Sequence, residues 1–142
     1  MILLDSDHIS VLQVPDNDRR TRLLQRMSAA GEERIGTTII TVEEQMRGWL
    51  ASVAKERTFA RQEYSYRKLR GLFDFYGGWE IIDVDGAAVF AFEELQRQKI
   101  RIGTMDLKIA AIDIACDALL LTANRRDFEQ VPALCFENWL DA

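Results

Sequence analysis

Acidic residues follow several apolar segments of this chain, where a strand gives way to a helix. Six of them lie in four separate segments: Asp5 and Asp7, Glu43 and Glu44, Asp106, and Asp127. Carboxylates gathered in one place repel one another, and at about 5 Å and an effective dielectric constant of about 20 each charged pair costs roughly 3 kcal/mol. Mg²⁺ or Mn²⁺ relieves such repulsion, and a chain with one His and two Cys offers no ligand set for zinc. A divalent ion held on carboxylates can activate water, so these acids predict metal-dependent phosphodiester hydrolysis.

Short apolar runs that alternate with helical patterns predict the elements that position these acids. The runs lack the polar alternation of a half-exposed strand, which is typical of strands buried on both faces of a parallel sheet. We expect strands at 2–4, 35–40, 79–84 and 119–121, with a small last strand at 134–136. We expect helices at 15–31, from 42 onward, at 53–76, 85–98 and 105–116, with a short turn or helix at 124–129.

Strands that alternate with helices require crossover connections. The predicted fold is therefore α/β: a three-layer α/β/α sandwich around a central parallel sheet of four to five strands, in one domain spanning residues 1–142. We expect Ser6 or Asp7 to cap the first helix and Thr41 to cap the next one. Ligands of open α/β sheets bind beyond the carboxyl ends of the strands, which is where all four acidic segments are predicted to lie.

The bulk properties narrow the function classes further. The net charge of −5 argues against a protein that coats nucleic acid, but it is compatible with a nuclease whose acids bind cations. The chain has no apolar run long enough to cross a membrane, and its amino terminus does not resemble a secretory signal, so a cytoplasmic location is expected. Cys116 and Cys135 are expected to be buried, reduced thiols.

Four segments together resemble a known family. They are LLDSDHIS at 3–10, ITVEEQMRG at 40–48, GTMDLKIAA at 103–111 and LTANRRDF at 121–128, the last followed by Val131-Pro132. In this order and at this spacing they resemble the motifs of PIN-domain ribonucleases, specifically the VapC toxins of toxin–antitoxin pairs. The resemblance spans nearly the whole chain, although each motif alone has little specificity.

The resemblance implies an endoribonuclease that cleaves single-stranded RNA or tRNA with Mg²⁺ or Mn²⁺, forms a homodimer, and is blocked by a small antitoxin protein. Asp5, Glu44 and Asp106 then correspond to metal-binding, catalytic carboxylates. Some relatives place the fourth acid where Asn124 stands and others at the position of Asp127. This chain fits the second pattern, which leaves Asn124 available to a metal-bound water.

Several further residues have two readings each. Asp7 either caps a helix or supports the metal, and Thr104 and Thr122 either orient metal-bound waters or make capping and strand-end hydrogen bonds. Arg47 and Arg125 either meet substrate phosphates or are ordinary solvated side chains. The remaining expectations are structural: His8 as a packing residue, Asp113 as a surface or partner-facing acid, and an aromatic stripe in core or dimer contact, formed by Phe59, Tyr66, Leu69, Phe73 and Tyr76.

Two other functions remain open from the residues alone. A PIN-like domain without catalysis could serve only as a binding module. The segment Leu4-Asp5-Ser6-Asp7 also resembles the Asp-x-Asp of haloacid-dehalogenase-type phosphatases, in which Asp5 would be the nucleophile. That fold needs further Ser/Thr, Lys and acidic motifs, and Leu121-Thr122 comes too late in the chain to leave room for them.

Overall fold

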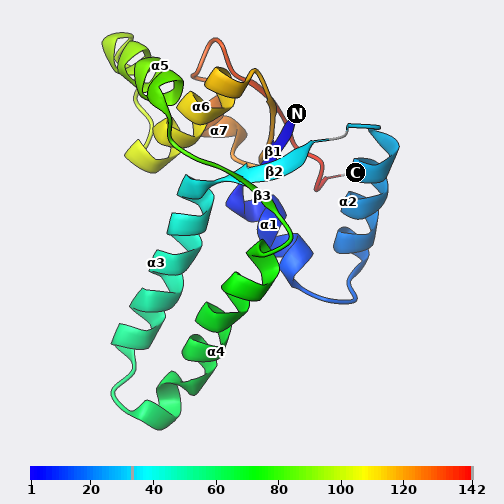
Figure 1. Ribbon diagram of the computed structural model, residues 1–142, viewed down its shortest axis with the longest axis vertical. Coiled ribbons are helices and arrows are strands. Elements are labelled where there is room, and N and C mark those ends of the chain that lie inside the picture. The colour runs from blue at the N-terminus through cyan, green and yellow to red at the C-terminus, as the bar shows by residue number, and fades with distance from the viewer. Residues whose placement is uncertain (33, 142) are drawn as a thin grey trace.

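The centre of the molecule is a sheet of five parallel strands, in a computed structural model that describes residues 1–32 and 34–141. Figure 1 shows its central strands side by side. The order across the sheet is β3-β2-β1-β4-β5, and every pairing is parallel. This confirms the predicted α/β fold and its strand number. The strands are β1 Ile2–Leu4, β2 Ile35–Thr38, β3 Glu80–Ile82, β4 Leu119–Leu121 and β5 Cys135–Glu137.

The neighbouring strands β1 and β4 show why their sequences are apolar throughout. Leu3 and Leu120 face one hydrophobic cluster, whereas Ile2, Leu4 and Leu121 face the other, and all five side chains are buried. Side chains of a strand alternate between its two faces, so a strand covered on both faces has no polar position.

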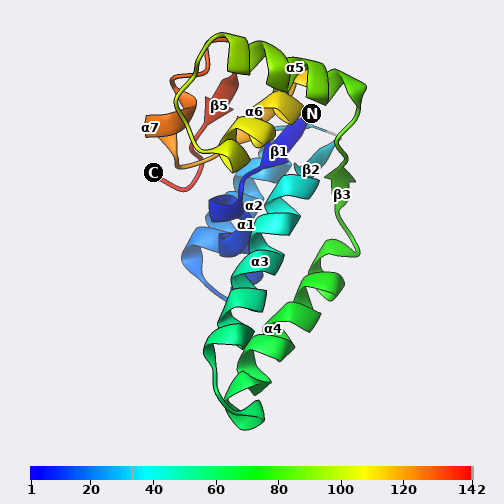
Figure 2. The same ribbon diagram turned by 90° about the vertical axis from the view of Figure 1, so that its left-hand side faces the viewer.

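Helices cover both faces of the sheet, as the three-layer prediction requires (Figure 2). On one face lie α1 Ser6–Gln13, α2 Asp18–Ala29, α3 Ile39–Lys55 and α4 Phe59–Tyr76; on the other lie α5 Gly86–Arg97, α6 Thr104–Cys116 and α7 Arg125–Phe128. The helices α3 and α4 run side by side as a hairpin that projects from the body, which we call the arm (Figure 1, Figure 2).

Three helix starts differ from the sequence prediction because a different residue provides the cap. The side chain of Asp5, rather than Ser6 or Asp7, caps α1. Thr38 accepts the N–H of Thr41, so β2 ends at Thr38 and the β-branched residues that follow begin α3. Asn17 caps α2, which therefore starts at Asp18 rather than near residue 15.

The predicted aromatic stripe on the helix at 53–76 was largely wrong as a core face. The helix is interrupted at 56–58, where Thr58 caps α4, and Phe59, Tyr66 and Phe73 are exposed. The face of α4 that packs against the rest of the molecule carries Leu72 and Tyr76. The arm extends beyond the body, so little of the chain covers its outer aromatic residues.

The expectation that both thiols are buried also fails: Cys135 is exposed and Cys116 is only partly buried, although both are free. In α5 the buried positions are Ala88 and Leu95, and Val89 is exposed. Of the helices in the described ranges, none is both long and apolar enough to cross a membrane.

Candidate active site

Asp5 is the most deeply placed carboxylate of the predicted set. It directly follows β1, where its Oδ1 accepts the backbone N–H of Ser6 at 2.7 Å and its Oδ2 accepts the hydroxyl of Thr122 at 2.8 Å. Only 5% of Asp5 is exposed. Burial and the neighbouring charge of Asp7 raise the pKa of Asp5 from 3.8 to about 6. The fold therefore holds this carboxylate where its negative charge is costly.

Asp7 links α1 to the loop after β4. Its Oδ1 lies 2.6 Å from His8 Nδ1, and its Oδ2 accepts the N–H of Ala123 at 2.8 Å. The Thr122 hydroxyl is also 3.4 Å from Oδ2. Burial raises the pKa of Asp7, but the hydrogen bonds from His8 and Ala123 outweigh it and hold that pKa below its usual value. Asp7 is thus a hydrogen-bonded anion in the first turn of α1, where Asp5 provides the cap.

Glu44 lies in α3 and has one carboxylate oxygen, Oε1, that is buried without a hydrogen-bond partner. Burial first, then the charges of Asp5 and Asp106, raise the pKa of Glu44 to about 7. The adjacent Glu43 instead forms an ion pair with Arg47 at 2.8 Å on the surface of the helix. The two neighbouring glutamates thus differ in their surroundings: Glu44 lies among the charges of Asp5 and Asp106, whereas Glu43 pairs with Arg47.

Asn124 holds the third and fourth acids together. Its Nδ2 donates to Asp106 Oδ2 at 3.2 Å and to Asp127 Oδ2 at 3.1 Å, while its Oδ1 accepts the N–H of Asp127 and caps α7. Burial and the charge of Asp127 raise the pKa of Asp106. The sequence left Asn124 and Asp127 as alternative fourth positions, and the structure brings both to Asp106.

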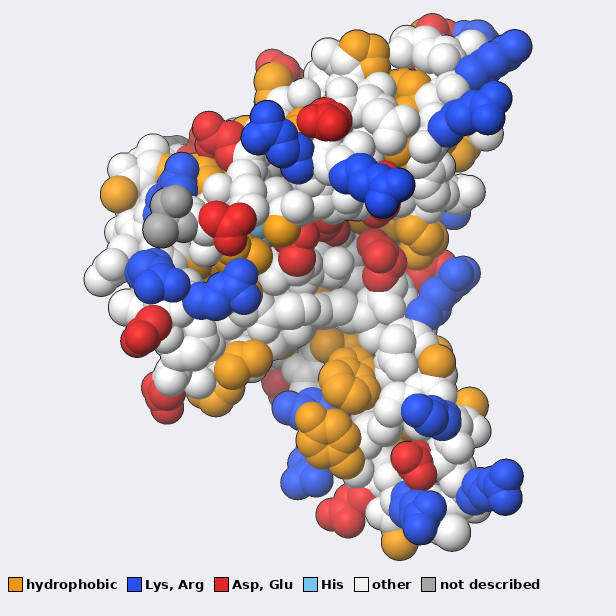
Figure 3. Space-filling model, turned by 180° about the vertical axis from the view of Figure 1, so that it is seen from behind, with side chains coloured by type: hydrophobic (Ala, Val, Ile, Leu, Met, Phe, Trp, Pro, Cys, Tyr) orange, Lys and Arg blue, Asp and Glu red, His pale blue; other side chains and the backbone are white. Residues whose placement is uncertain are grey.

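The predicted acids therefore reach one edge of the sheet from four chain segments. The neighbouring charges that raise the pKa of Asp5, Glu44 and Asp106 belong to other carboxylates of this group, with a further contribution from Glu43 at Glu44. The edge lies beyond the carboxyl ends of β1 and β4, where chain connections diverge to opposite sides of the sheet and ligands of such folds bind. Viewed from behind, acidic side chains gather in the hollow where the arm meets the body (Figure 3).

The donor atoms at this edge fit a hard divalent cation. They are carboxylate oxygens, which Mg²⁺ and Mn²⁺ select, and the buried Oε1 of Glu44 lacks a partner that such an ion would provide. Within the described ranges, no three His, Cys, Asp or Glu side chains are drawn together tightly enough to enclose an ion. The acids thus share an edge and raise one another's pKa, but among the described residues they do not form a closed set of ligands.

Three of the predicted supporting residues lie apart from this group. Thr104 is exposed at the start of α6, and its side chain makes no hydrogen bond with the described residues. Arg47 is paired with Glu43, and Arg125 lies 3.6 Å from Glu129 within its own helical turn. Both guanidinium groups are exposed and available to solvent or to a bound phosphate.

Sequence reasoning missed the environments of two residues. Asp113, expected at the surface, is 1% exposed, and its Oδ1 is buried without a partner. Burial and the charge of Asp117 raise the pKa of Asp113 to about 8. The signal was present: Asp113 is seven residues beyond Asp106 and so shares its inward helix face. His8 is fully buried and hydrogen-bonded on both ring nitrogens, which no local pattern indicates.

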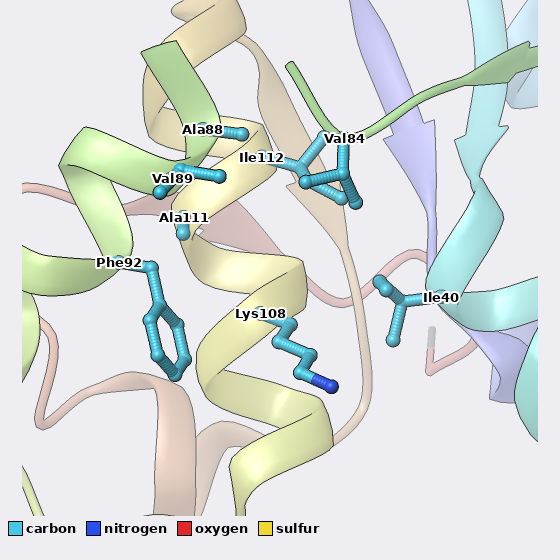
Figure 4. A pocket seen from close by; sticks show the side chains of 8 residues that line it. All are labelled: Ile40, Val84, Ala88, Val89, Phe92, Lys108, Ala111 and Ile112. Carbon is cyan, nitrogen blue, oxygen red and sulfur yellow. The ribbon is translucent and has the colours of Figure 1, made fainter. Parts of the chain in front are cut away.

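An apolar pocket of about 230 Å³ lies between α5, α6 and the start of α3. Figure 4 shows Lys108 reaching from α6 toward Ile40, with Phe92 on the opposite side. Among the described residues that line it, Lys108 alone carries a charge, and none of the predicted acids is a lining residue, so this pocket is separate from the carboxylate group. The lining residues are Ile40, Val84, Ala88, Val89, Phe92, Lys108, Ala111 and Ile112.

Comparison with known proteins gives one sequence relative and several structural ones. The chain is 38% identical over 69 residues to Ribonuclease VapC2 of Rickettsia felis, a match that covers 46% of this chain and 52% of that protein. The chain thus spans about half the length of this curated relative. No protein-family model matches the chain.

The structural similarity covers the whole chain. VapBC2 from Rickettsia felis, solved bound to a DNA fragment from its promoter, contains a chain with 28% identity and a TM-score of 0.71, over 98% of this chain and 99% of that one. VapBC-1 from nontypeable Haemophilus influenzae (22% identity, TM-score 0.72, 99% and 100%) and FitAcB from Neisseria gonorrhoeae (21%, 0.69, 100% and 100%) share the fold. The similarity to VapC2 over half the chain and to the VapBC2 chain over its whole length supports a PIN-domain protein of the VapC type, and the structures of lower identity share its fold.

Proposed function

We propose that this protein is an endoribonuclease that depends on Mg²⁺ or Mn²⁺ and acts as the toxin of a toxin–antitoxin pair. The observation that carries the proposal is the edge where burial and mutual repulsion raise the pKa of Asp5, Glu44 and Asp106. In the described part of the chain no Lys or Arg side chain forms an ion pair with these three acids, so a divalent ion is the suitable counter-charge. The similarity to Ribonuclease VapC2 supports RNA as the substrate.

Asp5, Glu44, Asp106 and Asp127 would hold the ion. When bound, it would supply the positive charge that activates water and stabilises the leaving oxygen of a phosphodiester. Thr122 keeps Asp5 in place through its hydroxyl, and Asn124 keeps Asp106 and Asp127 in place through its amide.

Two basic side chains near the edge, Arg47 and Arg125, would bind phosphates of the RNA backbone. Arg47 and Arg125 are exposed cations near two of the acidic segments, and each is paired only with a glutamate of its own helix. Exposed pairs of this kind contribute at most about 1 kcal/mol, so a phosphate can displace the glutamate at small cost. Their removal is expected to weaken RNA binding more than it slows cleavage.

An antitoxin partner is part of the proposal, because proteins that share this fold include a toxin-antitoxin complex from Klebsiella pneumoniae and VapBC-5 from Mycobacterium tuberculosis, a member of the VapBC family of toxin-antitoxin systems. A homodimer and a choice of tRNA as substrate rest on the family resemblance and stay predictions, as does a cytoplasmic location.

The test is cleavage of labelled RNA by the purified protein with Mg²⁺ or Mn²⁺, repeated with EDTA. We expect cleavage to stop in EDTA and in the variants Asp5→Asn and Glu44→Gln. Glu43→Gln is the matched control, because it removes a neighbouring charge that pairs with Arg47 rather than joining the acid group. Activity of the Glu43 variant should stay within about twofold of wild type.

Cleavage that continues in EDTA or in Asp5→Asn would contradict the metal-carboxylate mechanism. If the wild type binds RNA tightly but never cleaves it with either metal, the chain is the non-catalytic binding module. A phospho-enzyme formed on Asp5 from a phosphomonoester would instead support the phosphatase alternative.

A further inference from the structure

The single histidine of the chain has two hydrogen bonds that determine where its proton lies. His8 Nε2 is 3.1 Å from the backbone N of Trp139, and His8 Nδ1 is 2.6 Å from Asp7 Oδ1. A backbone N–H can only donate, so Nε2 must accept and carries no proton. The proton of the neutral ring is therefore on Nδ1, which donates it to Asp7.

Asp7 connects His8 to the loop beside the acidic edge. With Oδ1 held by His8, its Oδ2 accepts the N–H of Ala123 at 2.8 Å and lies 3.4 Å from the Thr122 hydroxyl. The same hydroxyl donates to Asp5 Oδ2 at 2.8 Å. Hydrogen bonds thus connect Trp139 through His8 to Asp7 and Asp7 to the backbone of Ala123, and the adjacent Thr122 holds Asp5 through its hydroxyl.

Trp139 is held independently of His8. Its ring is 9% exposed and packs in the cluster that contains Ile9 and Leu23. The guanidinium of Arg26 lies 4.8 Å from the ring centroid, and the indole Nε1 donates to Glu137 Oε2 at 2.9 Å. The N–H that meets His8 is therefore fixed by contacts with α2 and the end of β5.

We propose that His8 is a positioning residue: the Trp139 N–H fixes its tautomer, and the Nδ1–H that results holds Asp7, and through Asp7 the loop that orients Asp5, for binding a divalent ion. Groups that hydrogen-bond to metal ligands commonly change metal affinity or activity by about 10–100-fold when removed. This inference rests on the proposed function, because it assigns a role in the same acidic edge. It also explains why a chain segment 131 positions away from His8 is tied to the first turn of α1.

The tautomer can be tested without any activity measurement. In ¹⁵N-labelled protein, a long-range proton–nitrogen NMR spectrum of the one imidazole should show a protonated Nδ1 and an unprotonated Nε2. A coupling across the hydrogen bond between Trp139 N and His8 Nε2 is also expected. A proton on Nε2, or a doubly protonated ring at neutral pH, would overturn the proposal whatever the protein does to RNA.

Two substitutions of His8 separate its hydrogen bond to Asp7 from its hydrogen bond to Trp139. Asn places a side-chain N–H near the position of Nδ1, so His8→Asn can still donate to Asp7 but loses the bond to Trp139. Gln reaches the position of Nε2, so His8→Gln can accept from Trp139 but loses the bond to Asp7. We expect His8→Gln to raise the Kd for Mn²⁺, measured by calorimetry, and to lower kcat, each by about tenfold or more. For His8→Asn, both should stay within about threefold of wild type.

Arg26→Gln is the matched structural control, because it removes a contact of the Trp139 ring without touching the Trp139 backbone N–H, His8 or Asp7. It should lower the thermal midpoint while leaving kcat and the Kd for Mn²⁺ unchanged, and KM for RNA should stay unchanged in all three variants. Equal losses of Mn²⁺ affinity in the two His8 variants, or a loss in Arg26→Gln matching that of His8→Gln, would reduce His8 to a packing residue. If the wild type binds Mn²⁺ and shows the predicted tautomer but cleaves no RNA, the proposed ribonuclease fails while the positioning role stands.

Discussion

Asp5→Asn should stabilise the metal-free protein at neutral pH, although it removes a central carboxylate. The pKa of Asp5 rises from 3.8 to about 6 in the folded protein, mainly through burial. The folded state therefore holds its proton more tightly than the unfolded state, and stability falls as pH rises from about 4 to above 6. The difference between the two pKa values corresponds to about 3 kcal/mol lost at about pH 7.5.

The substitution also changes one hydrogen bond. Asn keeps an oxygen that can accept the N–H of Ser6, but its amide group must donate to Thr122, whose hydroxyl has to turn and accept. A rearranged hydrogen bond costs about 1 kcal/mol. The free energy of unfolding of Asp5→Asn should therefore exceed that of wild type by about 2 kcal/mol at about pH 7.5 in EDTA, which corresponds to about 4–8 °C in Tm. Near pH 4 the gain disappears, because Asp5 is then largely protonated in the folded wild type.

The assay is urea unfolding followed by the fluorescence of the three tryptophans, in EDTA and in excess Mg²⁺, over this pH range. Mg²⁺ should stabilise the wild type at neutral pH and have much less effect on Asp5→Asn, which lacks one of its ligands. The reasoning fails if the variant is less stable than wild type in EDTA at about pH 7.5, or if the difference between the two proteins does not change with pH.

Three further predictions concern separate parts of the molecule. Burial raises the pKa of Asp113 to about 8, so Asp113→Asn should reduce the loss of stability between about pH 4 and pH 7 by up to about 4 kcal/mol. Added Mg²⁺ should not produce the same stabilisation in wild type, and an unchanged pH profile of urea unfolding in the variant would contradict the prediction. Gly36→Ala should destabilise the sheet by about 1–3 kcal/mol, since a Cβ there would lie 2.4 Å from the backbone oxygen of Glu80, and a thermal midpoint equal to wild type would refute the close packing of β2 on β3. The affinity for Mn²⁺, measured by calorimetry, should increase as pH rises through about 6 to 7, because Asp5 and Glu44 must lose protons to bind the ion. An affinity that does not change with pH would count against Asp5 and Glu44 as ligands.

The positions of the acids relative to the sheet were predictable from the sequence. Asp5 follows an apolar run too short and too uniform for anything but a buried strand, and parallel strands deliver their carboxyl ends to one edge. The choice of Glu44 over Glu43 was predictable only from the family resemblance. In the structure Glu44 has an unpartnered Oε1 and Glu43 pairs with Arg47, and the assignment of Glu44 as a metal ligand stays a prediction.

The errors share one cause, which is that periodicity identifies a face but not what covers it. The spacing of Phe59, Tyr66 and Phe73 correctly describes a stripe on a helix, yet the arm projects from the body and leaves these rings exposed. The spacing of Asp113 from Asp106 indicates an inward face, but only the packing of α6 on the sheet shows that Asp113 is buried without a partner.

The sequence alone thus determined the α/β architecture and the presence of acids at one sheet edge, because both follow from local patterns repeated along the chain. Only the tertiary structure decided how those acids are held. Asn124 bridges Asp106 and Asp127, and the backbone of Trp139 reaches Asp7 through His8. Contacts between residues so far apart in the chain depend on the geometry of the completed fold, and no local pattern encodes which donor will meet which acceptor.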